Sequence, residues 1–202
     1  MQLGWHRTMT SDEALMLEFQ RGSREAFEEL FARYREPLYG FFRRRLASKD
    51  RAEDLAQETF LAVIRAAVRY EPRAMVKTYL YGIALKVLAA ERRRLSGNES
   101  QLEAEHEPAQ DSASESAVWV RQALAKLDAP EREILMLREY EQLNYEEIAE
   151  VLKLPVNTVR SRLFRARMAL KQFLEPQTRL RSMATGNIAR RQSKANPAGE
   201  EA

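Results

Sequence analysis

Hydrophobic residues along the chain recur at spacings of three and four, which is the period of amphipathic helices. The clearest stripe predicts a helix over about 75–94; it consists of Val76, Tyr79, Leu80, Ile83, Ala84, Val87 and Leu88. Similar stripes predict helices over about 10–19, 23–46 and 48–69. Together these segments predict one all-helical domain over residues 10–95.

The starts and breaks of these helices are also marked in the sequence. Thr10 and Glu13 fit a capping box, in which two side chains bond each other's backbone N–H groups. Ser23 and Ser48 are suited to cap the next two helices. Pro37 predicts a kink or a restart, because proline has no N–H to donate.

A second helical domain is predicted over residues 118–175, and it ends in two short helices. Asn144 and Glu147 fit a capping box that starts the first of them. Lys153-Leu154-Pro155 interrupts it, and proline is tolerated at the start of the next helix. That helix has the apolar stripe Val159, Leu163, Ala166 and Leu170. Two short helices across a tight turn predict a helix-turn-helix.

The polar face of that last helix is strongly basic. Residues 156–175 contain five Lys or Arg and one Glu, a net charge of +4. Such cations neutralise phosphates, and arginine pairs bidentately with guanine. The alternative is a solvated face whose cations complement the helix dipole. Because the charge coincides with helix-turn-helix spacing, we predict DNA contacts by Thr158, Arg160, Ser161, Arg162, Phe164, Arg165, Arg167 and Lys171.

Two polar segments of opposite net charge lie outside the two predicted domains. The chain has 202 residues, of which 45% are hydrophobic, so two modest cores are feasible. The formal net charge of +3 hides a net charge of −6 over 96–117 and of +3 over 176–202. We predict a flexible acidic linker over 96–117 and a basic, disordered tail over 176–202.

Several function classes are disfavoured by composition. The chain has no cysteine and only two histidines, and its seven glycines form no phosphate-binding loop. We therefore expect no catalytic residues, no metal site and no cofactor. No apolar run approaches the length of a membrane span, and no signal peptide opens the chain. These features predict a cytoplasmic protein that is not an enzyme.

Three short motifs occur in order along the chain. They are DLAQETFL over residues 54–61, YLYGIA over 79–84 and TVRSRLFRAR over 158–167. Together they resemble the extracytoplasmic-function (ECF) sigma factors of bacterial RNA polymerase, within the sigma-70 family. In that family the corresponding patterns are the polymerase-docking motif D-L-x-Q-E-x-F, the promoter-melting motif W-L-Y-x-I-A and the recognition-helix signature T-V-[KR]-S-R-L-x-R-A-R. The resemblance covers about 10–175.

The resemblance implies a promoter-specificity subunit that recruits core RNA polymerase to −10 and −35 promoter elements. It implies contact with the β′ clamp coiled coil and the β flap, and with promoter DNA, and it allows for an anti-sigma factor. Docking is expected at Asp54, Leu55, Gln57, Glu58 and Phe60. The family captures an unstacked −10 base near residues 70–78, which places −10 contacts at Tyr70, Arg73, Lys77, Tyr79 and Lys86.

Some residues depart from the family pattern, and one other function remains open. Tyr79 stands where tryptophan is usual, and Gly82, Leu85 and Lys86 replace commoner polar residues. Two arginine triplets lie at the ends of predicted helices: Arg43-Arg44-Arg45 and Arg92-Arg93-Arg94. Their cations either contact DNA phosphates or complement the helix dipole. The alternative function is a stand-alone helix-turn-helix regulator with an N-terminal sensing or dimerisation domain.

Overall fold

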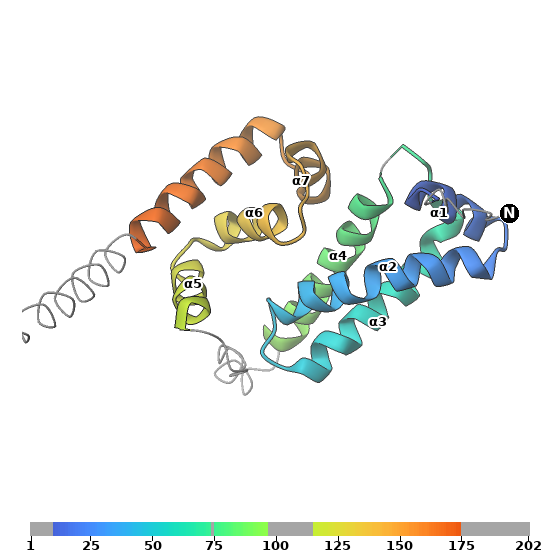
Figure 1. The fold of residues 1–202 in the computed structure, drawn as a ribbon, viewed down its shortest axis with the longest axis horizontal. Coiled ribbons are helices and arrows are strands. Elements are labelled where there is room, and N and C mark those ends of the chain that lie inside the picture. The colour runs from blue at the N-terminus through green and yellow to red at the C-terminus, as the bar shows by residue number, and fades with distance from the viewer. Residues whose placement is uncertain (1–9, 74, 97–114, 175–202) are drawn as a thin grey trace, which may run out of the picture. The chain divides into compact units, whose positions relative to one another are not determined.

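The structure is a computed structural model that describes residues 10–73, 75–96 and 115–174 (Figure 1). These residues form helices and, within the described ranges, no β-strand, so the predicted all-helical class is confirmed. None of the described helices is long and apolar enough to cross a membrane. Most of the predicted acidic linker and the predicted basic tail lie outside the described residues.

The described residues fall into two compact units. The first combines residues 10–96 with 137–156, and the second combines 115–136 with 157–174. The ends of the predicted linker are helical, since one helix extends to Ser96 and the next begins at Glu115.

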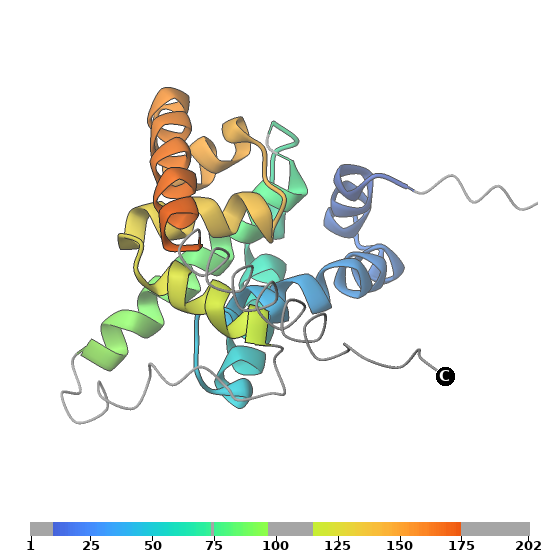
Figure 2. The same cartoon turned by 60° about the vertical axis from the view of Figure 1, so that its left-hand side comes forward.

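Four α-helices and one 3-10 turn make up the first part of the first unit. They are α1 (Asp12–Gln20), α2 (Arg24–Arg43), α3 (Lys49–Ala66), η1 (Ala67–Arg69) and α4 (Val76–Ser96). Helix α2 packs against α1 and α3, and α3 packs against α4 (Figures 1 and 2). The loop between η1 and α4 therefore lies at the end of α3, within reach of α1.

The helix starts follow the predicted signals with one exception. Ser23 and Ser48 accept hydrogen bonds from the third backbone N–H that follows each of them, at 3.2 and 3.1 Å. The predicted cap at Thr10 is wrong by one residue, because Ser11 accepts from the N–H of Ala14 at 3.2 Å. Helix α2 continues through Pro37 without a restart.

The core of these helices is built from large apolar side chains. Phe41, Phe42 and Leu38 of α2 are fully buried, together with Leu55 of α3 and Leu80 of α4. Burial of each such side chain stabilises the fold by about 1.5–3 kcal/mol relative to exposure. This packing fixes the rotation of α3 and α4, and so determines which of their residues face outward.

The same unit contains a buried ion-pair cluster at the end of α2. The side chain of Glu141 is 1% exposed and accepts hydrogen bonds from Arg44 at 3.0 Å and Arg45 at 3.2 Å. The Arg45 guanidinium also lies 3.7 Å from the centroid of the Phe41 ring. Arg45 is itself only 2% exposed. It is therefore not available at the surface for the phosphate contact that the sequence suggested.

Helices α5 (Glu115–Ala125), α6 (Ala129–Glu139) and α7 (Tyr145–Leu152) follow, and a last helix covers residues 156–174. In the second unit, Arg132 of α6 donates to the backbone oxygens of Leu124, Ala125 and Leu127, each at 2.8 Å. These bonds connect α6 to the end of α5 and to the turn after it, where carbonyls lack i→i+4 partners.

Candidate partner-binding and nucleic-acid interfaces

The predicted docking motif on α3 divides between two faces of the helix. The side chains of Asp54 and Glu58 are 59% and 51% exposed, and Gln57 beside them is exposed as well. Leu55 and Phe60 are instead buried in the core. Residues three and four apart share a helix face, which explains this division. Leu55 and Phe60 therefore orient α3, and the three polar side chains face outward.

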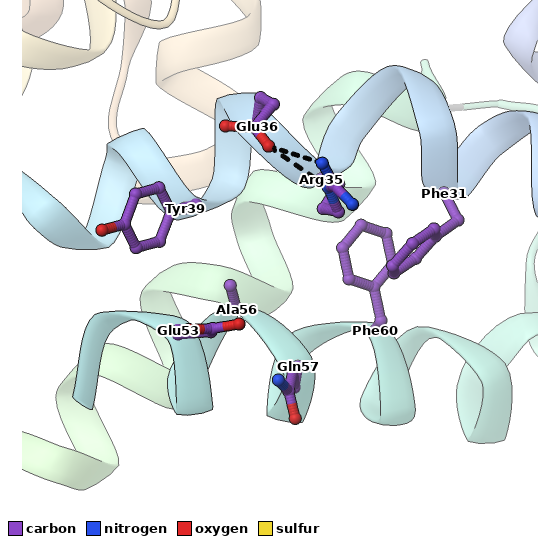
Figure 3. Close-up of a pocket in the computed structure, with 8 residues that line it drawn as sticks. All are labelled: Phe31, Arg35, Glu36, Tyr39, Glu53, Ala56, Gln57 and Phe60. Carbon is purple, nitrogen blue, oxygen red and sulfur yellow. Dashed lines mark hydrogen bonds and ion pairs between the residues drawn. The ribbon is translucent and has the colours of Figure 1, made fainter. Parts of the chain in front are cut away.

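A pocket of about 430 Å³ lies beside these polar side chains, between α2 and α3 (Figure 3). The rings of Phe31 and Phe60 lie 4.7 Å apart at one end of it. Arg35 and Glu36 of α2 form an ion pair on one side, and Gln57 lies on the other. An apolar end beside charged and polar side chains suits an amphipathic partner surface. The complete lining is Phe31, Arg35, Glu36, Tyr39, Glu53, Ala56, Gln57 and Phe60.

An arginine that the motif does not include connects this face to α4. Arg51 donates two hydrogen bonds, of 2.7 and 2.8 Å, to the two carboxylate oxygens of Glu91. Its remaining nitrogen lies 3.4 Å from Asp54 and 3.5 Å from Glu58. Arg51 therefore links the exposed acids to a carboxylate that is buried between α3 and α4.

The charges of this network are fixed by their hydrogen bonds. Bonds from Arg51, then from Arg94, lower the pKa of Glu91 to about 2, against the opposing effect of burial. The bond to Glu91 is also the main reason why the pKa of Arg51 is raised. Sequence analysis missed this pair, although Glu91 lies three residues after Leu88, at an inward position of the α4 stripe.

The candidate −10 residues are brought together only in part. Tyr70 is buried, and its ring packs edge-on against the ring of Tyr79, with centroids 5.2 Å apart. Arg73 is 89% exposed and pairs with Glu71 at 3.2 Å. Lys77 donates to the backbone oxygen of Gln142 at 3.1 Å. Lys86 is exposed. Of the predicted set, only Arg73 and Lys86 are exposed, whereas Lys77 and Tyr79 are half-buried and Tyr70 is buried.

The predicted break between α7 and the last helix is confirmed. Asn144 accepts from the N–H of Glu147 at 2.8 Å, and the Glu147 carboxylate accepts from the N–H of Asn144 at 2.6 Å. Helix α7 ends at Leu152, and the next residue, Lys153, has a left-handed φ of 53°. The N–H of Leu154 donates to the carbonyl oxygen of Ala149 at 2.9 Å. Local hydrogen bonds therefore define both ends of α7.

The last helix has the two faces that the sequence predicted. Val159, Leu163 and Ala166 are buried, whereas Leu170, the fourth residue of the predicted stripe, is half-buried. Thr158 and Arg162 are half-buried, whereas the other predicted DNA contacts are exposed: Arg160, Ser161, Phe164, Arg165, Arg167 and Lys171. The outward face thus carries several basic side chains and one exposed aromatic ring.

Two family models match this sequence. Sigma-70 region 2 matches residues 30–97, and Sigma-70, region 4 matches residues 117–170. Among curated relatives, the RNA polymerase sigma-H factor of Pseudomonas aeruginosa is 33% identical over 186 residues, which cover 84% of this chain and 96% of that protein. The ECF RNA polymerase sigma-E factor of Escherichia coli K12 is 31% identical over 183 residues, with coverage of 82% and 95%.

Two solved structures are similar as well. One is CnrH in complex with the cytosolic domain of CnrY, with a TM-score of 0.67, 26% identity and coverage of 83% of this chain and 99% of that one. The other is the sigma factor RpoE of Bartonella quintana in complex with the anti-sigma factor NepR. Its TM-score is 0.61, with 26% identity and coverage of 74% of this chain and 96% of that one.

Together, the two regions and the relatives define a promoter-specificity subunit. The chain belongs to the ECF sigma factors of the sigma-70 family. It is a sigma subunit that directs transcription initiation. The two family matches and the relatives favour this function over that of a stand-alone helix-turn-helix regulator.

Proposed function

We propose that this sigma subunit docks on core RNA polymerase through the exposed face of α3. Asp54, Gln57 and Glu58 would contact the β′ clamp coiled coil, while Leu55 and Phe60 act indirectly by orienting the helix. The observation that carries this proposal is the separation of one short motif into a buried apolar face and an exposed acidic face. An exposed acidic patch beside an apolar pocket suits a basic, partly apolar partner helix.

The experiment that tests docking is replacement of Asp54, Gln57 and Glu58 together with alanine. We expect the variant to lose co-purification with core polymerase and to keep its helicity, because the three side chains are exposed. A matched control replaces Glu25 and Glu28, two exposed acids on α2, and removes the same charge. Co-purification of the triple variant at the wild-type yield would show that docking lies elsewhere.

We propose that promoter DNA is read at two places. The segment after η1 and the first turns of α4 would read the −10 element, with Tyr70, Arg73, Lys77, Tyr79 and Lys86 as its candidate residues. The basic face of residues 156–174 would read the −35 element in the major groove. The second assignment is supported by six exposed polar or aromatic side chains on one helix.

Further partners follow from the family and from the solved relatives. Because both similar structures are complexes with a second protein, we propose that an anti-sigma factor binds this chain too. We also propose contact with the β flap and a cytoplasmic location, where the polymerase acts. A gel shift with and without core polymerase tests dependence on the enzyme: tight, specific binding by the free chain would favour a stand-alone regulator.

A further inference from the structure

Helix α1 lies outside the part of the chain that matches Sigma-70 region 2, since that match begins at residue 30. Two of its polar side chains nevertheless reach the segment proposed to read the −10 element. Gln20 donates to the backbone oxygens of Ala67 and Tyr70, at 2.5 and 2.8 Å. Glu13 accepts from the N–H of Val76 at 3.2 Å.

These bonds close both ends of the segment between η1 and α4. Ala67 is the first residue of η1, and Tyr70 directly follows its last residue. The Ala67 carbonyl also accepts from the N–H of Tyr70 at 2.9 Å, so Gln20 is its second donor. Val76 is the first residue of α4, where backbone N–H groups lack helical partners. The amide of Gln20 uses both of its N–H groups, and the carboxylate of Glu13 acts as a cap supplied from another helix.

The spacing of Glu13 and Gln20 on α1 sets the distance between the two ends of the segment. Glu13 and Gln20 are seven residues apart, which places them on one helix face about 10 Å apart along the axis. Helix α1 itself is held on α2, because Asp12 accepts from Arg33 at 2.5 Å and from the hydroxyl of Tyr34. Leu15 and Met16 of α1 are buried as well. The separation of the two segment ends is therefore set by a helix that is firmly packed.

We infer that Gln20 and Glu13 are positioning residues for −10 recognition. They hold the backbone on either side of Tyr70 and Arg73 in the conformation that receives a promoter base, without contacting DNA themselves. This inference rests on the proposed −10 function of that segment. Pre-organisation of a binding segment improves discrimination because less ordering remains to be done on binding.

The test uses full-length chain assembled with core polymerase, on a cognate promoter selected with the wild-type enzyme. Transcription is measured on two template sets, one with single changes in the −10 element and one with single changes in the −35 element. Glu13→Met with Gln20→Met removes the polar groups and preserves side-chain length. Glu13→Gln keeps an accepting oxygen and serves as the conservative variant. Glu18→Met, at an exposed position of α1, is the control.

We expect the double variant to lose about fivefold or more in −10 discrimination, because it lacks all three hydrogen bonds, with −35 discrimination within about twofold of wild type. Glu13→Gln with Gln20 intact should match wild type, as should Glu18→Met. A merely structural role would lower both discriminations in equal proportion, and that result would overturn the inference. Unchanged −10 discrimination in the double variant would overturn it as well.

Two further measurements keep the outcomes separate. If the double variant does not fold, Gln20→Met alone is compared with wild type, and full −10 discrimination in that folded variant overturns the inference. Amide hydrogen exchange at Val76 should speed up in Glu13→Met and not in Glu18→Met. If the wild-type holoenzyme shows no preference among the −10 templates, the proposed −10 role of the segment is overturned. If the wild type discriminates among them and the variants discriminate equally well, only the positioning role of Gln20 and Glu13 is overturned.

Discussion

Glu131 near the start of α6 holds Arg165 on the basic face of the last helix, through an ion pair of 2.8 Å between the carboxylate and Nε. The Arg165 side chain is 58% exposed, whereas that of Glu131 is 16% exposed. An exposed pair of this kind contributes about 0–1 kcal/mol. A bidentate contact with guanine is worth about 1–3 kcal/mol of discrimination. An ion pair of this strength does not prevent Arg165 from making the proposed contact with a base edge.

The first prediction separates base reading from phosphate contact on this helix. Arg165→Ala should lose about 1–3 kcal/mol of discrimination among −35 sequences, because it removes a bidentate donor. Lys171→Ala, nearer the end of the helix, should weaken binding to all sequences alike and reduce the salt slope by about one. Binding of polymerase holoenzyme to a set of mutated −35 sites, at several salt concentrations, measures both effects. Identical behaviour of the two variants would refute this division of roles.

The second prediction concerns the acid sensitivity of the Arg51–Glu91 pair. The pKa of Glu91 is lowered from 4.5 to about 2 in the folded chain. Its ionised form therefore stabilises the fold fully above about pH 4.5, by on the order of 3 kcal/mol, and this stabilisation is lost as pH falls toward 2. Glu91→Gln should lower the free energy of unfolding at pH 7 and flatten its dependence on pH between about 4.5 and 2.

Urea unfolding of wild type and Glu91→Gln at pH 7, 5 and 3 measures this difference. Glu58→Gln is the control, since its carboxylate is exposed and only 3.5 Å from the same arginine. The gap in stability between wild type and Glu91→Gln should narrow as the solution becomes more acidic. A gap of constant size at all three pH values would contradict the proposed role of the charge.

The third prediction separates packing from docking within one motif. Phe60→Ala should lower the free energy of unfolding by about 3–5 kcal/mol, because it leaves a cavity in the core. Asp54→Ala should change it by no more than about 0.5 kcal/mol, as expected for an exposed position, and should weaken binding to core polymerase. Urea unfolding and co-purification are measured on the same preparations. Weaker binding by Phe60→Ala at undiminished stability would mean that Phe60 contacts the polymerase directly.

Features that depend on neighbouring residues in the chain could be predicted from the sequence. The capping box at Asn144 and Glu147 involves residues three apart, and it forms as predicted. The stripe of Val159, Leu163 and Ala166 is buried as its period requires. Both features follow from helix geometry alone, so no knowledge of the rest of the fold was needed.

Features that depend on distant residues could not be predicted in the same way. Thr10 and Glu13 have the spacing of a capping box, yet Glu13 accepts from Val76, 63 residues further along the chain. A carboxylate bonds whichever donor the fold brings to it, and the local pattern does not show which donor that is. The pairing of Arg51 with Glu91 across 40 residues has the same character.

The last prediction concerns the basic tail, which lies outside the described residues. Residues 176–202 carry five Lys or Arg and two Glu, and their apolar residues show no helical or strand period. Such a segment adds DNA affinity that is independent of sequence and strongest at low salt, because it acts by releasing counterions. Deletion of residues 177–202 should therefore leave promoter choice unchanged and lower affinity modestly at low ionic strength. Transcription from strong and weak promoters at two salt concentrations measures both. A deletion that changes which promoters are used, or that abolishes activity at every salt concentration, would mean that the tail binds a specific surface.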